Sequence, residues 1–158
     1  MRTMDDLQRI RVAVTGADGL IGSVLRAGLS GHFDPRWLTR TEADITDLAA
    51  LERAFGGSEA VVHLAATPDV EATWEEVLPP NVIGAYNAYE AAARAGVRRF
   101  EPPAVAARVP RMWLSHRDCV SLVEAALTAD VGFAIVNGVS DNAGRWLSLR
   151  VRSHAGWP

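Results

Sequence analysis

The sequence predicts an α/β protein built around a doubly wound parallel sheet, and two stretches carry that prediction. In the first, the apolar run Ile10–Val14 leads into a glycine-rich turn and then into a helical pattern that reaches Leu29. In the second, residues 60–66 form a continuous apolar run, which is typical of parallel strands buried on both faces. Helical patterns separate these runs, so successive strands are expected to lie parallel.

Three glycines shape the turn after the first strand: Gly16, Gly19 and Gly22. The first permits a tight turn, the second lets backbone N–H groups approach a phosphate, and the third lets the helix pack closely on the strand. A pyrophosphate would then lie at the positive end of the helix dipole. The same spacing also occurs in plain turns of other α/β proteins, but the flanking strand and helix favour nucleotide binding.

The next elements continue the alternation of strands and helices. Gly31 is placed to end the first helix, and residues 35–39 are expected to form the second strand. Asp47 is expected to cap a helix over 48–55, which the following pair of glycines ends. The strand over 60–66 comes next, with small residues at its carboxyl end, where ligands of open α/β sheets bind.

Two pairs of prolines interrupt the pattern of helices and strands after residue 70. A helical pattern begins near Glu71, is interrupted by Pro79-Pro80, resumes over 81–92 and stops at Gly96. The two prolines after Glu101 cannot serve in a central strand, so the sheet pattern breaks there. Further on, Ser115 is expected to cap a helix over 119–127, and 133–136 is expected to form a buried strand.

Several side chains allow two interpretations. A dinucleotide fold usually carries an acid about twenty residues past its glycines, but this chain has Arg40 near that position. Arg40 could receive the 2′-phosphate of NADP or be a solvated loop charge, and both interpretations stay open. His63 lies inside an apolar run, so we expect a hydrogen-bonded core histidine. Cys119 is expected to be a small core residue.

Composition excludes several classes of protein. A net charge of -3 gives no footprint for nucleic acid, and no apolar run approaches the ~20 residues of a membrane span. The N-terminal residues are polar, which favours a cytoplasmic protein. The four histidines show no metal-ligand spacing, and Ser140 lacks the second glycine of a hydrolase nucleophile elbow. The sequence contains no lysine, so all 16 basic residues are arginine.

Four motifs, in this order, resemble the extended short-chain dehydrogenase/reductase superfamily, and in particular its NAD-dependent epimerase/dehydratase group: 12–22, Asp44-Ile45, 63–66 and 81–87. Within that group, residues 111–118 and 138–142 are similar to the uronate dehydrogenases, which oxidise the anomeric carbon of glucuronate or galacturonate with NAD. The resemblance implies a single Rossmann-like domain over 1–158, with a dinucleotide-binding half (10–100) and a remnant of the C-terminal part (104–158). It also implies NAD or NADP as the cofactor.

The resemblance assigns roles to individual residues. It places the three glycines at the pyrophosphate, Asp44-Ile45 at the adenine ring, and the two alanines at the end of the strand expected over 60–66 beside the adenosine ribose. It matches Arg111 to an arginine that holds the uronate carboxylate, although a surface charge beside Pro110 is the alternative. The complete set of implied cofactor residues is Gly16, Asp18, Gly19, Leu20, Ile21, Gly22, Arg40, Asp44, Ile45, Leu64, Ala65 and Ala66.

The family's catalytic segment has no counterpart in this chain. In that family a strand ending in serine and a helix bearing Tyr-x-x-x-Lys lie where this chain passes directly from Phe100 to Arg108, so the fold is expected to be truncated. The tyrosines, Tyr86 and Tyr89, are followed at the fourth position by glutamate and alanine, and the resemblance places both in structural packing. No catalytic residue is therefore assigned.

Three hypotheses follow for the function. The first is an NAD(P)-binding protein without full dehydrogenase activity. The second is an active NAD(P)-dependent oxidoreductase on uronic acids or related sugars, completed by a second chain. The third is a structural or regulatory module that dimerises. In each case we expect a homo-oligomer formed through an exposed sheet edge, because an uncovered edge invites pairing.

Overall fold

The computed structural model describes residues 9–101 and 115–129. The chain divides into two compact units, 1–103 and 104–158. The break falls beside the boundary that the sequence placed between the dinucleotide-binding half and the C-terminal remnant. The single domain over 1–158 stays a prediction.

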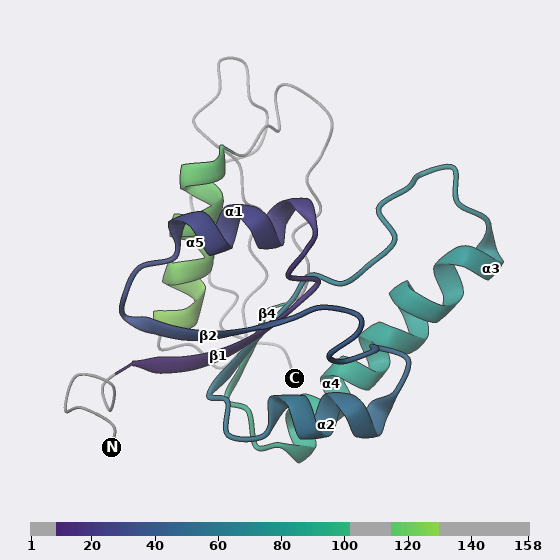
Figure 1. The fold of residues 1–158 in the computed structure, drawn as a ribbon, viewed down its shortest axis with the longest axis horizontal. Helices are drawn as coiled ribbons and strands as arrows, with labels where there is room; N and C mark the ends of the chain where they lie inside the picture. Colours follow the sequence, from purple (N-terminus) through teal and green to yellow (C-terminus); the bar gives the residue numbers. More distant parts are fainter. Residues whose placement is uncertain (1–8, 102–114, 130–158) are drawn as a thin grey trace, which may run out of the picture. The chain divides into compact units, whose positions relative to one another are not determined.

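Four parallel strands form the sheet of the first unit, in the order β2-β1-β3-β4 (Figure 1). The chain forms β2 on one side of β1 and then returns to form β3 on the other side of β1. This reversal confirms the doubly wound, Rossmann-like sheet. The strands are β1 (Ile10–Thr15), β2 (Phe33–Leu38), β3 (Ala60–His63) and β4 (Arg99–Glu101).

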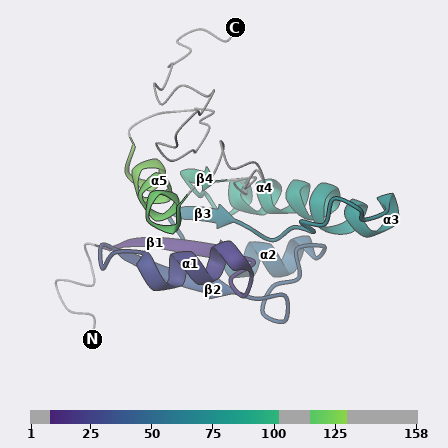
Figure 2. The ribbon, with the colours of Figure 1, turned by 90° about the horizontal axis from the view of Figure 1, so that it is seen from above.

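Helices connect the strands on both faces of this sheet. In Figure 1, α1 lies above the strands, whereas α2 and α4 lie below them, and Figure 2 shows the same layers from above. None of the helices in the described ranges is long and apolar enough to cross a membrane. The helices of this unit are α1 (Leu20–Gly28), α2 (Leu48–Phe55), α3 (Trp74–Val77), η1 (Leu78–Gly84) and α4 (Ala85–Arg94).

The core of this unit fills the space between the sheet and the layer of α2 and α4. Phe55 and Leu51 of α2 are fully buried there, and α4 presents alanines that let it pack closely. Burying a phenylalanine or leucine side chain contributes roughly 1.5–3 kcal/mol. The buried residues of this core are Ala13, Leu38, Ala43, Leu51, Ala54, Phe55, Val61, Ala88, Ala91 and Ala92.

Two strand boundaries differ from the sequence prediction. The second strand begins at Phe33 rather than at 35 and includes Pro35. This is possible because β2 lies at the end of the described sheet, where a missing N–H removes no bond to a further strand. The third strand ends at His63, so Leu64–Ala66 follow the strand instead of extending it.

The predicted interruption at Pro79-Pro80 is wrong. The segments α3, η1 and α4 follow one another without a break from Trp74 to Arg94, and both prolines lie in the π-helical turns of η1. A proline has no N–H for an α-helical bond, and the wider π turn changes the bonding pattern around it. The helix therefore passes through the proline pair.

Helix caps follow the predicted polar residues. Asp47 accepts a hydrogen bond from the Ala50 N–H at 3.0 Å, which confirms it as the cap of α2. Ser115 accepts from the Asp118 N–H at 3.1 Å and caps α5 (His116–Thr128), which begins three residues earlier than predicted. The first helix ends at Gly28, before Gly31, because Leu29 is already extended.

The second unit is described only at α5 and its ends. Every fourth residue along one side of α5 is buried, in the series Cys119, Val123 and Leu127. This confirms the cysteine as a core residue, and burial raises the pKa of its thiol. The strand predicted over 133–136, Arg111 and Ser140 lie outside the described residues.

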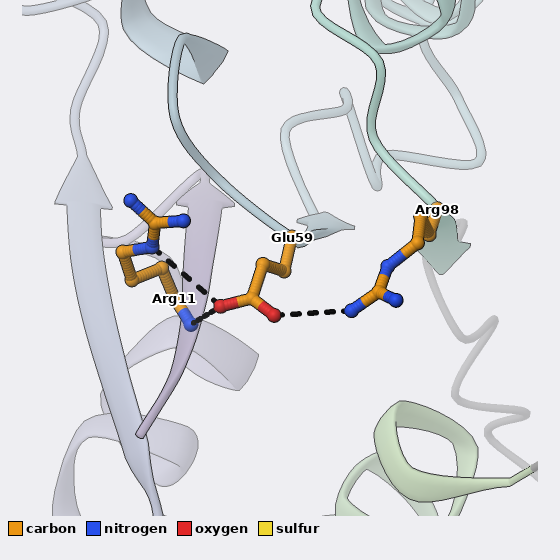
Figure 3. A network of polar contacts seen from close by, with 3 residues as sticks. All are labelled: Arg11, Glu59 and Arg98. Carbon is orange, nitrogen blue, oxygen red and sulfur yellow. Dashed lines mark hydrogen bonds and ion pairs between the residues drawn. The ribbon is translucent and has the colours of Figure 1, made fainter. Parts of the chain in front are cut away.

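A chain of ion pairs ties three segments together at the amino ends of the strands (Figure 3). The Glu59 carboxylate is 3.5 Å from the Arg11 guanidinium and 3.1 Å from that of Arg98. The backbone reinforces the link, because the Glu59 N–H donates to the Arg11 carbonyl at 2.8 Å. All three side chains contact solvent, so each pair contributes below about 1 kcal/mol.

Candidate functional site

The candidate site lies where the strand order reverses, at the carboxyl ends of β1 and β3. In open α/β sheets, ligands bind in the crevice at this position, because the helices after the two strands leave on opposite faces. The glycine loop 16–19 follows β1, and Leu64–Ala66 follow β3, its neighbour in the sheet. The structure therefore brings two of the predicted cofactor segments together.

Gly16 is the closest point of contact between the two segments. Its φ is +67°, a conformation that side chains other than glycine rarely adopt. A Cβ at this position would lie 2.7 Å from the Ala65 nitrogen and 2.8 Å from the Leu64 carbonyl carbon. Both the turn and the space therefore require glycine.

The other two glycines pack against the loop itself. A Cβ at Gly22 would lie 2.6 Å from the Gly16 carbonyl oxygen and 2.7 Å from that of Ala17. A Cβ at Gly19 would lie 3.2 Å from the same Gly16 oxygen, to which the Gly19 N–H donates at 3.0 Å. The glycine spacing thus lets α1 begin directly on top of the loop.

The amino end of α1 offers backbone donors to an anion. Its N-cap is Gly19, which has no side chain that could cap the helix, and the first turn carries no acidic residue. The first N–H groups of a helix have no intrahelical acceptor, and the helix dipole favours negative charge there. Leu20 is 78% exposed beside these groups, and Asp18 is exposed as well.

Arg40 lies on the loop after β2 with its side chain 87% exposed and pairs with Asp44 at 3.6 Å. Asp44 also accepts from the N–H and the hydroxyl of Thr46, at 2.9 and 2.7 Å. These hydrogen bonds, followed by the Arg40 charge, lower the pKa of the Asp44 carboxyl. The structure thus joins two of the predicted cofactor residues in one loop, with the guanidinium facing solvent.

Ile45, the neighbour of Asp44, contacts two residues of the helical segment after β3. The Asn87 side chain donates to the Ile45 carbonyl at 3.1 Å. Gly84 leaves room for the isoleucine side chain, since a Cβ there would lie 2.6 Å from its Cδ1. Asn87 is buried and fixes a predicted adenine contact, a role that the sequence prediction missed.

A second asparagine clamps the loop after β3. The Asn81 side chain accepts from the Thr67 N–H at 2.7 Å and donates to the Thr67 carbonyl at 3.0 Å. This pair of bonds fixes the far end of the Leu64–Thr67 stretch. Amides inside an otherwise apolar helical pattern indicate that hydrogen-bond partners are needed, but the sequence does not say which residues supply them.

His63, the last residue of β3, is 1% exposed, and its Nδ1 lies 2.7 Å from the Thr15 hydroxyl. This confirms the hydrogen-bonded core histidine. Burial lowers the pKa of His63 from 6.5 to about 4, so the ring is neutral at pH 7.

The two tyrosines differ in their surroundings. Tyr89 stacks on Phe100 with ring centroids 4.1 Å apart, whereas Tyr86 is 66% exposed. The expectation of structural packing is therefore wrong for Tyr86, which projects from the outer face of α4. Within the described ranges, no group of three or more His, Cys, Asp or Glu side chains could hold a metal ion.

The parallel sheet and the glycine loop define a Rossmann-like α/β protein. The amino end of α1 has no side-chain cap and lies where the strand order reverses. Residues 12–101 match the NAD dependent epimerase/dehydratase family, and the chain belongs to that family.

Known relatives are sugar dehydrogenases. The chain is 41% identical over 98 residues to the L-arabinose 1-dehydrogenase (NAD(P)(+)) of Haloferax volcanii, a match that covers 57% of this chain and 39% of that protein. It is 27% identical to the uronate dehydrogenase of Pseudomonas syringae pv. tomato over 218 positions, which cover 90% of this chain and 79% of that protein.

Among solved structures, uronate dehydrogenase from Agrobacterium tumefaciens, a mutant complexed with NAD, is similar with a TM-score of 0.70 and 27% identity. The superposition covers 86% of this chain and 79% of that structure. The alignment to the Pseudomonas enzyme extends over more positions than this chain has residues.

Proposed function

We propose that this protein binds NAD or NADP at the amino end of α1 and lacks full dehydrogenase activity. One observation carries the binding proposal: the Gly16 backbone contacts the segment after β3 so closely that a Cβ would overlap it. The loop after β1 and the segment after β3 therefore lie against each other at the switch point, and we call these two loops the proposed cradle. The cradle, the uncapped helix and the absence of an acid in its first turn all suit a pyrophosphate.

The proposed contacts divide among the predicted residues. Backbone N–H groups around Gly19–Gly22 would hold the pyrophosphate, together with the backbone N–H of the neighbouring Asp18. Asp44 and Ile45 would border the adenine, and Leu64–Ala66 the adenosine ribose. When bound, the cofactor would supply hydride acceptor chemistry.

The proposed lack of full activity rests on proton chemistry. Oxidation of a sugar hydroxyl requires a group that takes its proton, and in this family a tyrosine does so beside a lysine. The chain has no lysine, and Tyr86 and Tyr89 lie on α4 without one at the fourth following position. The chain therefore offers a cofactor cradle without the family's proton acceptor.

Calorimetric titration with NAD, NADH, NADP and NADPH tests the binding proposal. We expect saturable binding of at least one of the four. An absorbance assay with glucuronate and galacturonate then separates the proposal from the alternative, an active oxidoreductase on uronic acids. Failure of all four to bind would remove both and leave the structural or regulatory module.

The charge on Arg40 leads to a prediction about cofactor choice. If its exposed guanidinium receives the 2′-phosphate, Arg40→Asp should weaken NADP binding by about tenfold or more and leave NAD binding nearly unchanged. Arg53→Asp, an exposed change on α2, serves as the control for altered net charge. Equal losses for NAD and NADP would remove this role from Arg40.

We also propose a homo-oligomer formed through the β4 edge. Pro35 blunts the β2 end of the described sheet, whereas β4 ends the other side beside the half-exposed Tyr89. Light scattering over a hundredfold range of protein concentration should show a mass above that of the monomer at the upper end. A constant monomer mass over the whole range would contradict the proposal.

A further inference from the structure

We propose that Thr15 and His63 are positioning residues for the cofactor cradle. Their side chains form a hydrogen-bond relay that holds the Leu64–Ala65 backbone against Gly16. The relay is a property of the protein without ligand, and only its effect on cofactor affinity rests on the proposed function.

The relay is built where two neighbouring strands end together. Thr15 closes β1 and His63 closes β3, and the two residues are paired across the sheet. The Thr15 hydroxyl oxygen lies 2.7 Å from His63 Nδ1, and both side chains are 1% exposed. The two residues are 48 positions apart in sequence, so the pairing is a product of the fold.

The same hydroxyl oxygen also receives the chain that leaves β3. The Leu64 N–H lies 3.2 Å from it and the Ala65 N–H 3.4 Å. The Leu64 N–H also donates to the Thr15 carbonyl at 3.3 Å. One threonine therefore anchors two consecutive amides at the point where the chain passes Gly16.

Counting donors fixes the direction of each bond. A hydroxyl has one hydrogen and two acceptor lone pairs. Because two amides donate to the Thr15 oxygen, its hydrogen is directed to Nδ1 of His63, which accepts. The neutral imidazole then carries its proton on Nε2. Burial, which lowers the pKa of His63 to about 4, keeps the ring neutral at pH 7, so that one of its nitrogens is free to accept.

The relay acts on the cradle through the close backbone contact. The Ala65 nitrogen lies at the position that leaves no room for a Cβ on Gly16. Any outward shift of Leu64–Ala65 would therefore change the wall behind the glycine loop. Residues that touch no ligand thus set the width of the proposed cradle.

Paired variants test the relay. Thr15→Val keeps the shape and removes the hydroxyl, whereas Thr15→Ser retains it. At the other end, His63→Leu removes the acceptor and His63→Asn offers an amide oxygen near the Nδ1 position. Thr128→Val removes an exposed hydroxyl on α5 that donates to the Glu124 carbonyl at 2.9 Å, and it serves as the control.

Three measurements give the outcome. In the unliganded protein, we expect amide exchange at Leu64 and Ala65 to accelerate about tenfold in Thr15→Val and His63→Leu, and to stay near the wild-type rate in Thr15→Ser, His63→Asn and Thr128→Val. Nitrogen NMR of the wild type should show His63 protonated on Nε2. The affinity of whichever cofactor binds should fall about tenfold in the first two variants.

Unchanged exchange in Thr15→Val, or a His63 ring protonated on Nδ1, would overturn the relay. If a variant does not fold, the NMR measurement on the wild type decides. Loss of exchange protection with unchanged affinity would refute the effect on the cradle. Absence of cofactor binding by the wild type would instead refute the proposed function, and the exchange and NMR results would still test the relay.

Discussion

Replacing Gly16 by alanine is expected to abolish measurable cofactor binding, with a loss of at least about a hundredfold in affinity. The positive φ alone costs an alanine roughly 1–2 kcal/mol. The added Cβ would also overlap the Ala65 nitrogen at 2.7 Å, and that neighbour is backbone, which cannot rotate away. The loop must therefore move, and the cradle opens. Calorimetry measures the affinity, and urea denaturation should show roughly 3 kcal/mol of lost stability.

Alanine variants at two other glycines separate the cost of a positive φ from the cost of an overlapping Cβ. Gly96 has a similar φ of +71°, but no atom lies within 4 Å of the position that a Cβ would take, so Gly96→Ala should lose only the strain energy and keep its cofactor affinity. Gly31, exposed and also without a close neighbour, should tolerate alanine in both assays. Gly16→Ala binding cofactor as tightly as Gly96→Ala would refute the close-contact account of the cradle.

Acid is expected to destabilise the protein through His63, by about 3 kcal/mol in total. The pKa of this residue is about 4 in the folded state and 6.5 when exposed, because burial disfavours the charged ring. The unfolded chain therefore takes up the proton first. Stability should be complete above pH 6.5, fall as the pH drops from 6.5 towards 4, and lose nothing further to this histidine below that. Denaturation midpoints measured across this pH range give the dependence of stability on pH.

Variants at two histidines test which residue causes the pH dependence of stability. His63→Leu should remove most of this pH dependence between pH 6.5 and 4.5, whatever its effect on total stability. His32→Gln changes an exposed histidine and should leave it in place. Glu42 and Asp44, whose carboxyl pKa values are lowered mainly by hydrogen bonds from Thr39 and Thr46, lose their contribution only at more acidic pH. A wild-type slope that survives His63→Leu would contradict this assignment.

Local signals in the sequence predicted much of the fold. The glycine turn was predictable because each glycine reports a backbone constraint within a few residues of itself, and the cap at Asp47 was predictable for the same reason. The continuous apolar run at 60–66 indicated a central strand, and β3 is buried at every position.

Features that depend on an unusual helical turn or on contacts elsewhere in the fold were not predictable. The helix continues through Pro79-Pro80 because π-helical turns accommodate them, which periodicity does not report. Asn81 and Asn87 are explained only by Thr67 and Ile45, which lie on loops 14 and 42 positions away in sequence. The sequence identified His63 as a core residue, but its bond to Thr15 exists only because β1 and β3 lie side by side.

The most direct test of the proposal is a mixing experiment with cofactor-saturated protein. After calorimetry has identified the cofactor that binds, the oxidised form is added to saturation with glucuronate or galacturonate, and the absorbance of the reduced cofactor is followed. Gly16→Ala, which is expected not to bind, gives the background. We predict saturable binding and no reduced cofactor above that background. One equivalent or more of reduced cofactor per chain would contradict the account and establish an active dehydrogenase.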